Sequence, residues 1–155
     1  MSQASTCIAF VDNIRLFGTV AKQRQILDVR NTVTDFPRLL GKMFNDPSAQ
    51  REMSLTTNIY RELEDGRIGV QVSYFGQDEI LTPEQLYAMQ LTKLVEITET
   101  NLGTKVVDIV INAPSYFTDS ERRALMDASR IAGLNCVRII NDTTASMSNL
   151  FSNPS

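Results

Sequence analysis

VVDIVINAPSYFTDSERRALMDASRIAGLNCVRIINDTTASM, residues 106–147, is the stretch that decides the fold of this chain. Its apolar run at 106–113 has the length and composition of a strand that is buried on both faces, and the proline that follows cannot donate to a ladder. Thr118 then begins a capping-box pattern, and apolar residues recur at helical spacing as far as Gly133, which is placed to end a helix. A second apolar run at 134–140 leads into another helix start. Strand, helix, strand and helix in this order predict a parallel α/β unit with a right-handed crossover.

The composition excludes several classes of function. The 155 residues carry a net charge of −3, and their Lys and Arg residues are scattered, so the chain has no basic surface for nucleic acid or acidic membranes. No apolar stretch approaches the roughly 20 residues that a membrane-spanning helix needs. The chain contains no histidine, which excludes a Ser-His-Asp or Cys-His catalytic group and any histidine-ligated metal within it.

The two cysteines indicate the redox environment. Cys7 and Cys136 are too few and too far apart in sequence to predict a disulfide framework or a zinc site. Cys136 lies in an apolar run and is expected to be an inert buried thiol. A reducing, cytosolic compartment is the simplest interpretation.

The first half of the chain, residues 7–81, is predicted to be a small α+β region. Asp65 and Gly66 stand between two alternating runs and are typical of a hairpin turn, and a second turn is expected at 76–78. The predicted elements, in chain order, are strands at 7–11 and 14–17, a helix at 19–25, a short helix at 34–41, a helix from 47, strands at 58–63 and 68–75, and a short strand at 79–81.

A long helix is predicted to follow, from Thr82 as N-cap to Gly103 as its end. Residues of one face are expected to be buried: Tyr87, Leu91, Leu94, Val95 and Leu102. Residues of the opposite face are polar: Gln85, Thr92, Lys93, Glu96 and Glu99.

Part of the chain resembles the first lobe of the ATPase domain of the seventy-kilodalton heat-shock chaperones. Three segments carry this resemblance: APSYFTDSERR (113–123), IAGLNC (131–136) and RIINDTTA (138–145). The resemblance is closer to their one-hundred-and-ten-kilodalton relatives, which act as nucleotide-exchange partners. It implies an actin-like, ribonuclease-H-like α/β ATPase lobe that is incomplete. Residues 7–81 would form the smaller α+β subdomain over the nucleotide cleft, and residues 82–155 part of the α/β subdomain.

Lys22 is the first site residue that the resemblance implies. The segment GTVAK, residues 18–22, matches a family motif whose lysine reaches the phosphates of ATP and helps to position the attacking water. A point cation suits this role because it stabilises charge on a transferring phosphoryl group. From the residues alone, Lys22 is one solvated lysine among many. Thr19 stands where the seventy-kilodalton members usually carry Asp, which favours the other branch.

Asp142 follows the second apolar run and opens the next predicted helix, where a carboxylate commonly serves as an N-terminal cap. The resemblance implies instead that Asp142 lies near the metal and water of the nucleotide, without being a direct metal ligand. Pro114 and Arg122 match a pair that relays the nucleotide state toward a substrate-binding domain. Arg138 matches a position near the interdomain linker.

The function that the resemblance implies is that of a chaperone: a holdase and nucleotide-exchange factor that binds ATP or ADP with Mg. Its partners would be a seventy-kilodalton chaperone and unfolded clients, in the cytoplasm and also the nucleus. Two phosphate loops of the family have no counterpart here, so we expect a fragment that neither hydrolyses ATP nor binds it tightly. Two alternatives stay open: a piece of a seventy-kilodalton ATP-hydrolysing foldase, and a structural or interaction module without a nucleotide role.

Overall fold

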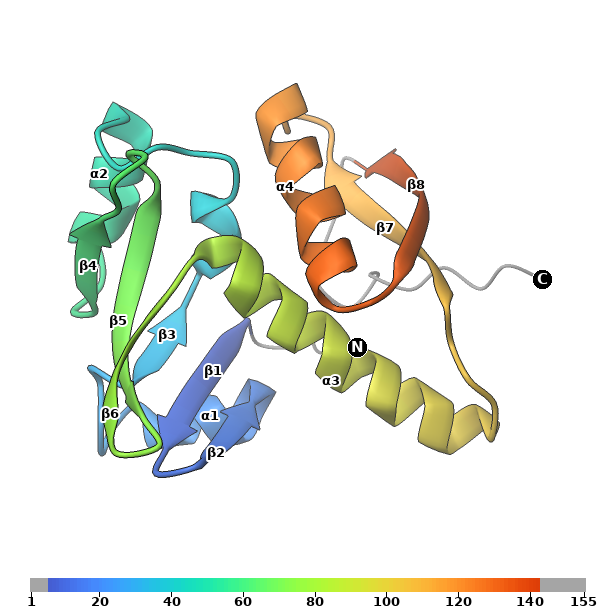
Figure 1. Ribbon diagram of the computed structural model, residues 1–155, viewed down its shortest axis with the longest axis horizontal. Helices are drawn as coiled ribbons and strands as arrows, with labels where there is room; N and C mark the ends of the chain where they lie inside the picture. Colours follow the sequence, from blue (N-terminus) through green and yellow to red (C-terminus); the bar gives the residue numbers. More distant parts are fainter. Residues whose placement is uncertain (1–5, 143–155) are drawn as a thin grey trace.

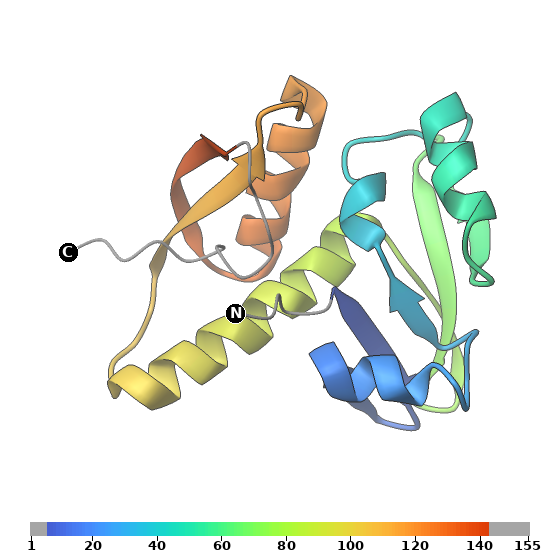
Figure 2. The ribbon, with the colours of Figure 1, turned by 180° about the vertical axis from the view of Figure 1, so that it is seen from behind.

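The computed structural model describes residues 6–142. Helix α3, Pro83–Leu102, runs diagonally through the middle of the molecule (Figure 1). An α+β part built from residues 7–81 lies on one side of it, and a strand–helix–strand unit built from residues 108–142 lies on the other (Figure 2). None of the helices within the described residues is long and apolar enough to cross a membrane.

The α+β part contains two three-stranded antiparallel sheets, with strand orders β2-β1-β3 and β4-β5-β6. Short hairpins join most neighbouring strands, as the alternating pattern predicts. The elements are β1 (Cys7–Val11), β2 (Ile14–Phe17), α1 (Gly18–Arg24), β3 (Thr32–Thr34), the 3-10 helix η1 (Phe36–Leu39), α2 (Pro47–Ser54), β4 (Ile59–Glu62), β5 (Ile68–Tyr74) and β6 (Gln77–Leu81).

Two details of this part differ from the prediction. Strand β3 was not predicted, because three residues carry little periodicity and become a strand only by pairing with β1. The second hairpin turn was placed at 76–78, but it lies at Phe75 and Gly76, whose φ angles are 55° and 74°. Positive φ at both central residues is what a tight hairpin requires, so Gln77 already belongs to β6.

Helix α3 begins and ends where the sequence predicts. The Thr82 hydroxyl accepts from the backbone N–H of Gln85 at 3.2 Å, the Gln85 side chain accepts from the N–H of Thr82 at 2.9 Å, and Gly103 adopts φ 69° at the other end. The predicted apolar face was only partly right: Leu102 is 65% exposed, whereas Gln90 is buried. The reason is that α3 lies between two parts of the molecule and is covered on more than one side.

The α/β unit has the predicted order of strand, helix and strand, but its first strand is buried on one face and not on both, since only the alternate residues Ile109, Ile111 and Ala113 are buried. Strand β7 (Asp108–Pro114), helix α4 (Asp119–Ile131) and strand β8 (Asn135–Asp142) follow in order, and the two strands pair in parallel. Thr118 caps α4, and Gly133, at φ 75°, follows its last turn. A helix was expected to start at 141–144, but Asn141 and Asp142 belong to β8, and the rest of that segment lies outside the described residues.

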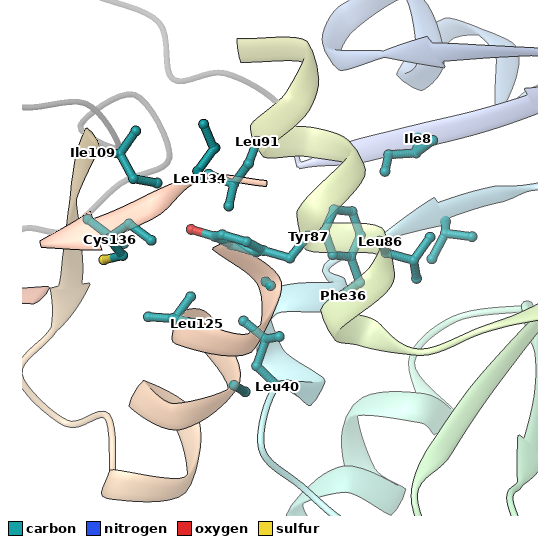
Figure 3. Close-up of a cluster of buried hydrophobic side chains, with 14 of the residues drawn as sticks. Ile8, Phe36, Leu40, Leu86, Tyr87, Leu91, Ile109, Leu125, Leu134 and Cys136 are labelled. Carbon is teal, nitrogen blue, oxygen red and sulfur yellow. The ribbon is translucent and has the colours of Figure 1, made fainter. Parts of the chain in front are cut away.

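The main hydrophobic core is continuous across α3 (Figure 3). Buried side chains of the α+β part, of α3 and of the α/β unit belong to the same cluster, among them Ile8, Phe36, Leu40, Leu86, Tyr87, Leu91, Ile109, Leu125 and Cys136. Helix α3 therefore contributes core side chains to both parts.

Candidate functional site

Lys22 lies on the exposed side of α1. The helix is held by Ala21, which is buried against Cys7 and Ala9 of β1. Burial raises the pKa of the Cys7 thiol to about 11, an effect that the positive charge of Lys22 partly opposes and that Asp35 reinforces. The Lys22 ammonium is therefore close enough to β1 to act on Cys7, while its side chain remains open to solvent.

The carboxyl ends of β7 and β8 bring together three of the residues implied by the resemblance. Pro114 and Asp142 are partners in the parallel register, so both lie at the same edge of the sheet. Arg122, in the first turns of α4, donates from Nη2 to Oδ1 of Asn141, the neighbour of Asp142. The side chain of Asp142 lies outside the described part. This edge is where open α/β sheets usually bind ligands.

Arg138 does not join this group. It is exposed in the middle of β8 and pairs with Val110, away from the carboxyl ends of the strands. Cys136 is buried as predicted, and burial raises the pKa of its thiol. Both cysteines are therefore poor nucleophiles at neutral pH.

The structure does not bring Lys22 to the carboxyl edge of the sheet. Figures 1 and 2 both show α1 and the end of β8 on opposite sides of α3. The sequence motifs placed Lys22 and Asp142 in one site, and the described residues leave them apart.

A groove of about 570 Å³ lies elsewhere, on the seam between the α+β part and α4. Its lining includes Gly41, Glu84, Ser120 and Arg123, but none of the residues implied by the resemblance. Sequence reasoning missed this groove because it joins segments about 40 residues apart, and the only local signal is the glycine at 41.

The described residues do not by themselves fit a whole nucleotide. A triphosphate is usually cradled by successive backbone N–H groups, whereas the strand edge offers Arg122, which is already bonded to Asn141. Within residues 6–142, no three Asp, Glu or Cys side chains cluster in a way that could hold a metal ion.

Comparison with known proteins identifies the fold. A family model described as Hsp70 protein matches residues 3–148. The chain belongs to the Hsp70 family. The match covers both sides of α3, and it confirms the prediction of a part of an actin-like ATPase lobe with mixed helices and sheets.

Similar proteins place this Hsp70-family chain in the one-hundred-and-ten-kilodalton branch. It is 45% identical to the 97 kDa heat shock protein of Strongylocentrotus purpuratus over 138 residues, which cover 89% of this chain and 16% of that protein. It is 45% identical to heat shock protein 110 of Caenorhabditis elegans over 141 residues, 90% of this chain and 18% of that protein. Heat shock 70 kDa protein 4 of Homo sapiens is 42% identical over 139 residues, 90% of this chain and 16% of that protein. The chain thus spans less than a fifth of the length of these relatives.

Proposed function

We propose that this chain acts as part of an ATP-binding molecular chaperone of the one-hundred-and-ten-kilodalton type. In this proposal the whole protein holds unfolded clients and promotes nucleotide exchange on a seventy-kilodalton chaperone, in the cytoplasm and nucleus. The observation that carries the proposal is the family match over residues 3–148, together with relatives from that branch that cover about nine tenths of the chain.

The proposed switch residues are Pro114 and Arg122. They lie at the carboxyl edge of the β7–β8 sheet, where the backbone of Asp142 and the side chain of Asn141 also lie. The Arg122 guanidinium is bonded to the uncharged amide of Asn141. It can therefore change to a charged partner without leaving an unpaired charge on Asn141, which suits a relay. Arg138 is proposed to act separately, since it lies away from this edge.

Lys22 is proposed to contact the phosphates of ATP. Its ammonium is exposed and its helix is anchored by a buried alanine, so the side chain is free to meet a ligand. Asp142 is proposed to act near the metal and water. Because Lys22 and the end of β8 lie apart, the two residues share one nucleotide only in the presence of further protein segments that complete the site.

The isolated chain is therefore expected to bind Mg-ATP weakly and to show no turnover. Isothermal titration calorimetry with the 155-residue chain, and phosphate release measured at a large excess of ATP, would test this. ATP turnover that the Lys22→Ala variant abolishes would contradict it.

The function itself is tested with the whole protein that contains this chain. Release of fluorescent ADP from a seventy-kilodalton chaperone should be faster in its presence, and Lys22→Ala should weaken this effect. Lys93→Ala, on the exposed face of α3, is the matched control and should leave release unchanged. No acceleration by the wild-type protein would overturn the proposal, and strong ATP turnover stimulated by a J-protein would favour a foldase.

A further inference from the structure

Gly41 makes a backbone contact that no other residue could make. It has φ 70°, and a Cβ atom placed on it would lie 2.6 Å from the carbonyl oxygen of Ser120 and 2.7 Å from the backbone nitrogen of Glu121. These atoms belong to the first turn of α4, so they cannot swing aside as the end of a flexible side chain can. The α+β part and the α/β unit therefore touch here backbone to backbone.

The loop that carries Gly41 is held on both sides. Leu40 is fully buried in the continuous core, in the same cluster as Leu125 of α4 (Figure 3). The N–H of Gly41 donates to Oε2 of Glu84, in the first turn of α3, at 3.4 Å. One short loop thus meets the first turns of both helices.

The seam around this contact is open. The groove of about 570 Å³ has walls from both parts, with Arg67 on one side and Arg123 on the other. Among the described elements, α4 packs mainly on α3 and β8. The Gly41 loop is a place where α4 meets the α+β part directly.

The same turn of α4 also leads to the edge of the sheet. Arg122 follows Glu121, one of the residues that Gly41 touches, and donates to Oδ1 of Asn141 at the end of β8. A displacement of this turn by the Gly41 loop would move the guanidinium against its partner.

We propose that the contact between Gly41 and α4 is a conformational joint between the α+β part and the α/β unit, and that Gly41 limits the rotation at this joint. Its backbone contact with the first turn of α4 sets the angle between the α+β part and the α/β unit, and it transmits a change of this angle to the Arg122–Asn141 contact. The joint is a property of these described residues and does not depend on nucleotide binding.

Gly41→Ala tests the joint in the 155-residue chain, with Gly103→Ala as the matched control. Both glycines have positive φ, 70° and 69°, but no atom lies within 4 Å of a Cβ at position 103. Both variants therefore place an alanine in an unfavourable backbone conformation, whereas only Gly41→Ala also creates a steric clash with another segment. To reach an ordinary contact of 3.4 Å from 2.6 Å, the loop at 41 must move by at least 0.8 Å.

Residual dipolar couplings of backbone amides report the angle directly. One common orientation should fit β4–β6 and α4 in the wild type and in Gly103→Ala. In Gly41→Ala, the two sets should require a relative rotation, and the amide signal of Asn141 should shift. A common orientation in Gly41→Ala as well, or an unmoved Asn141 signal, would overturn the proposal.

A milder variant decides the question if Gly41→Ala does not fold. Glu84→Gln keeps the glycine and the size of the side chain but weakens the bond from the Gly41 N–H, because that bond then lacks a charged acceptor. It should accelerate hydrogen exchange at Gly41 and shift the Asn141 signal. If hydrogen exchange at Gly41 is faster and the Asn141 signal does not shift, the proposed transmission to the Arg122–Asn141 contact is wrong. If neither changes, the bond to Glu84 does not hold the Gly41 loop as proposed.

Discussion

The two parts of this molecule on either side of α3 are built by different kinds of contact. In the α+β part, antiparallel strands are mostly joined by short hairpins, so pairing partners are close in sequence. In the α/β unit, β7 and β8 are parallel and depend on the intervening α4. One face of their sheet is buried through Ile109 and Ile111, whereas Val137 and Ile140 are 57% and 37% exposed. The comparison shows that most strand pairing in the α+β part comes from local hairpins, whereas the α/β unit depends on packing between segments far apart in the chain.

A shared core nevertheless joins the two parts, and the largest prediction tests whether they unfold together. Phe36→Ala in the α+β part should lower the free energy of unfolding by about 3–5 kcal/mol, and Leu125→Ala in α4 by about 2–5 kcal/mol, because both side chains are buried in one cluster. Urea unfolding of each variant should show a single transition. It is followed by circular dichroism and amide NMR signals, because the chain contains no tryptophan. Two separate transitions would show that the parts are independent. Ile26→Ala, at a side chain that is 89% exposed, is the control.

Gln90→Leu should stabilise the boundary between the parts. The Gln90 side chain is buried on α3, and its Oε1 has no hydrogen-bond partner among the described residues. An unpaired buried acceptor costs about 1–3 kcal/mol, so an apolar side chain of similar size should recover about 1 kcal/mol in urea unfolding. Gln85→Leu is the matched control on the same helix. It should destabilise the protein because the Gln85 side chain completes the capping box. Equal effects of the two substitutions would contradict this interpretation of Gln90.

Helix capping should matter more for α3 than for α4. Thr82→Ala removes a hydroxyl that accepts at 3.2 Å within a reciprocal capping box, and it should cost about 1 kcal/mol. At Thr118 the corresponding bond is 3.5 Å long, so Thr118→Ala should cost less. Thermal melts of the two variants measure the difference. A larger loss at Thr118 would show that α4, and not α3, limits the stability of the boundary.

The last expected effect appears only at alkaline pH and arises in the α+β part. The pKa of Cys7 is raised from 9.0 to about 11 by burial, so the folded state holds its thiol proton more tightly than the unfolded state. This contribution to stability is complete below pH 9.0 and is lost as the pH rises from 9.0 through about 11. Urea unfolding across that window should therefore show a steeper fall for the wild type than for Cys7→Ala. Parallel curves would place the alkaline sensitivity elsewhere, for example at Tyr60, whose pKa is also raised by burial.

Much of the fold could be predicted, because its signals are local. The strand at 7–11, the Asp65-Gly66 hairpin, the N-cap at Thr118 and the glycines at 103 and 133 each depend on a few neighbouring residues, and the structure confirms them. The full capping box predicted at Thr118 is not formed, because the Glu121 carboxylate accepts from the Thr118 hydroxyl and not from the backbone N–H of Thr118. Strand β3 and the burial of Gln90 could not be predicted, since both depend on partners far along the chain.

The residues of the candidate site are predictions from the resemblance, and the structure shows where they lie. Pro114 lies at the carboxyl edge of the sheet because it ends β7, and Arg122 lies near that edge because its side chain bonds to Asn141 near the end of β8. The separation of Lys22 from that edge, and the groove beside Gly41, depend on how α3 orients the two parts, which no local pattern reports.

The sequence by itself determined the order of strands and helices, their caps and turns, and the family of the chain. The elements, caps and turns follow from hydrogen-bonding capacity, backbone preference and apolar spacing within short windows. The family follows instead from the resemblance of residues 113–123, 131–136 and 138–145 to known proteins. Only the tertiary structure decided that the first turn of α4 meets the backbone of Gly41 in the α+β part, and that α3 contributes to one core on both sides. Such contacts depend on shape complementarity between surfaces that form only after each element has folded.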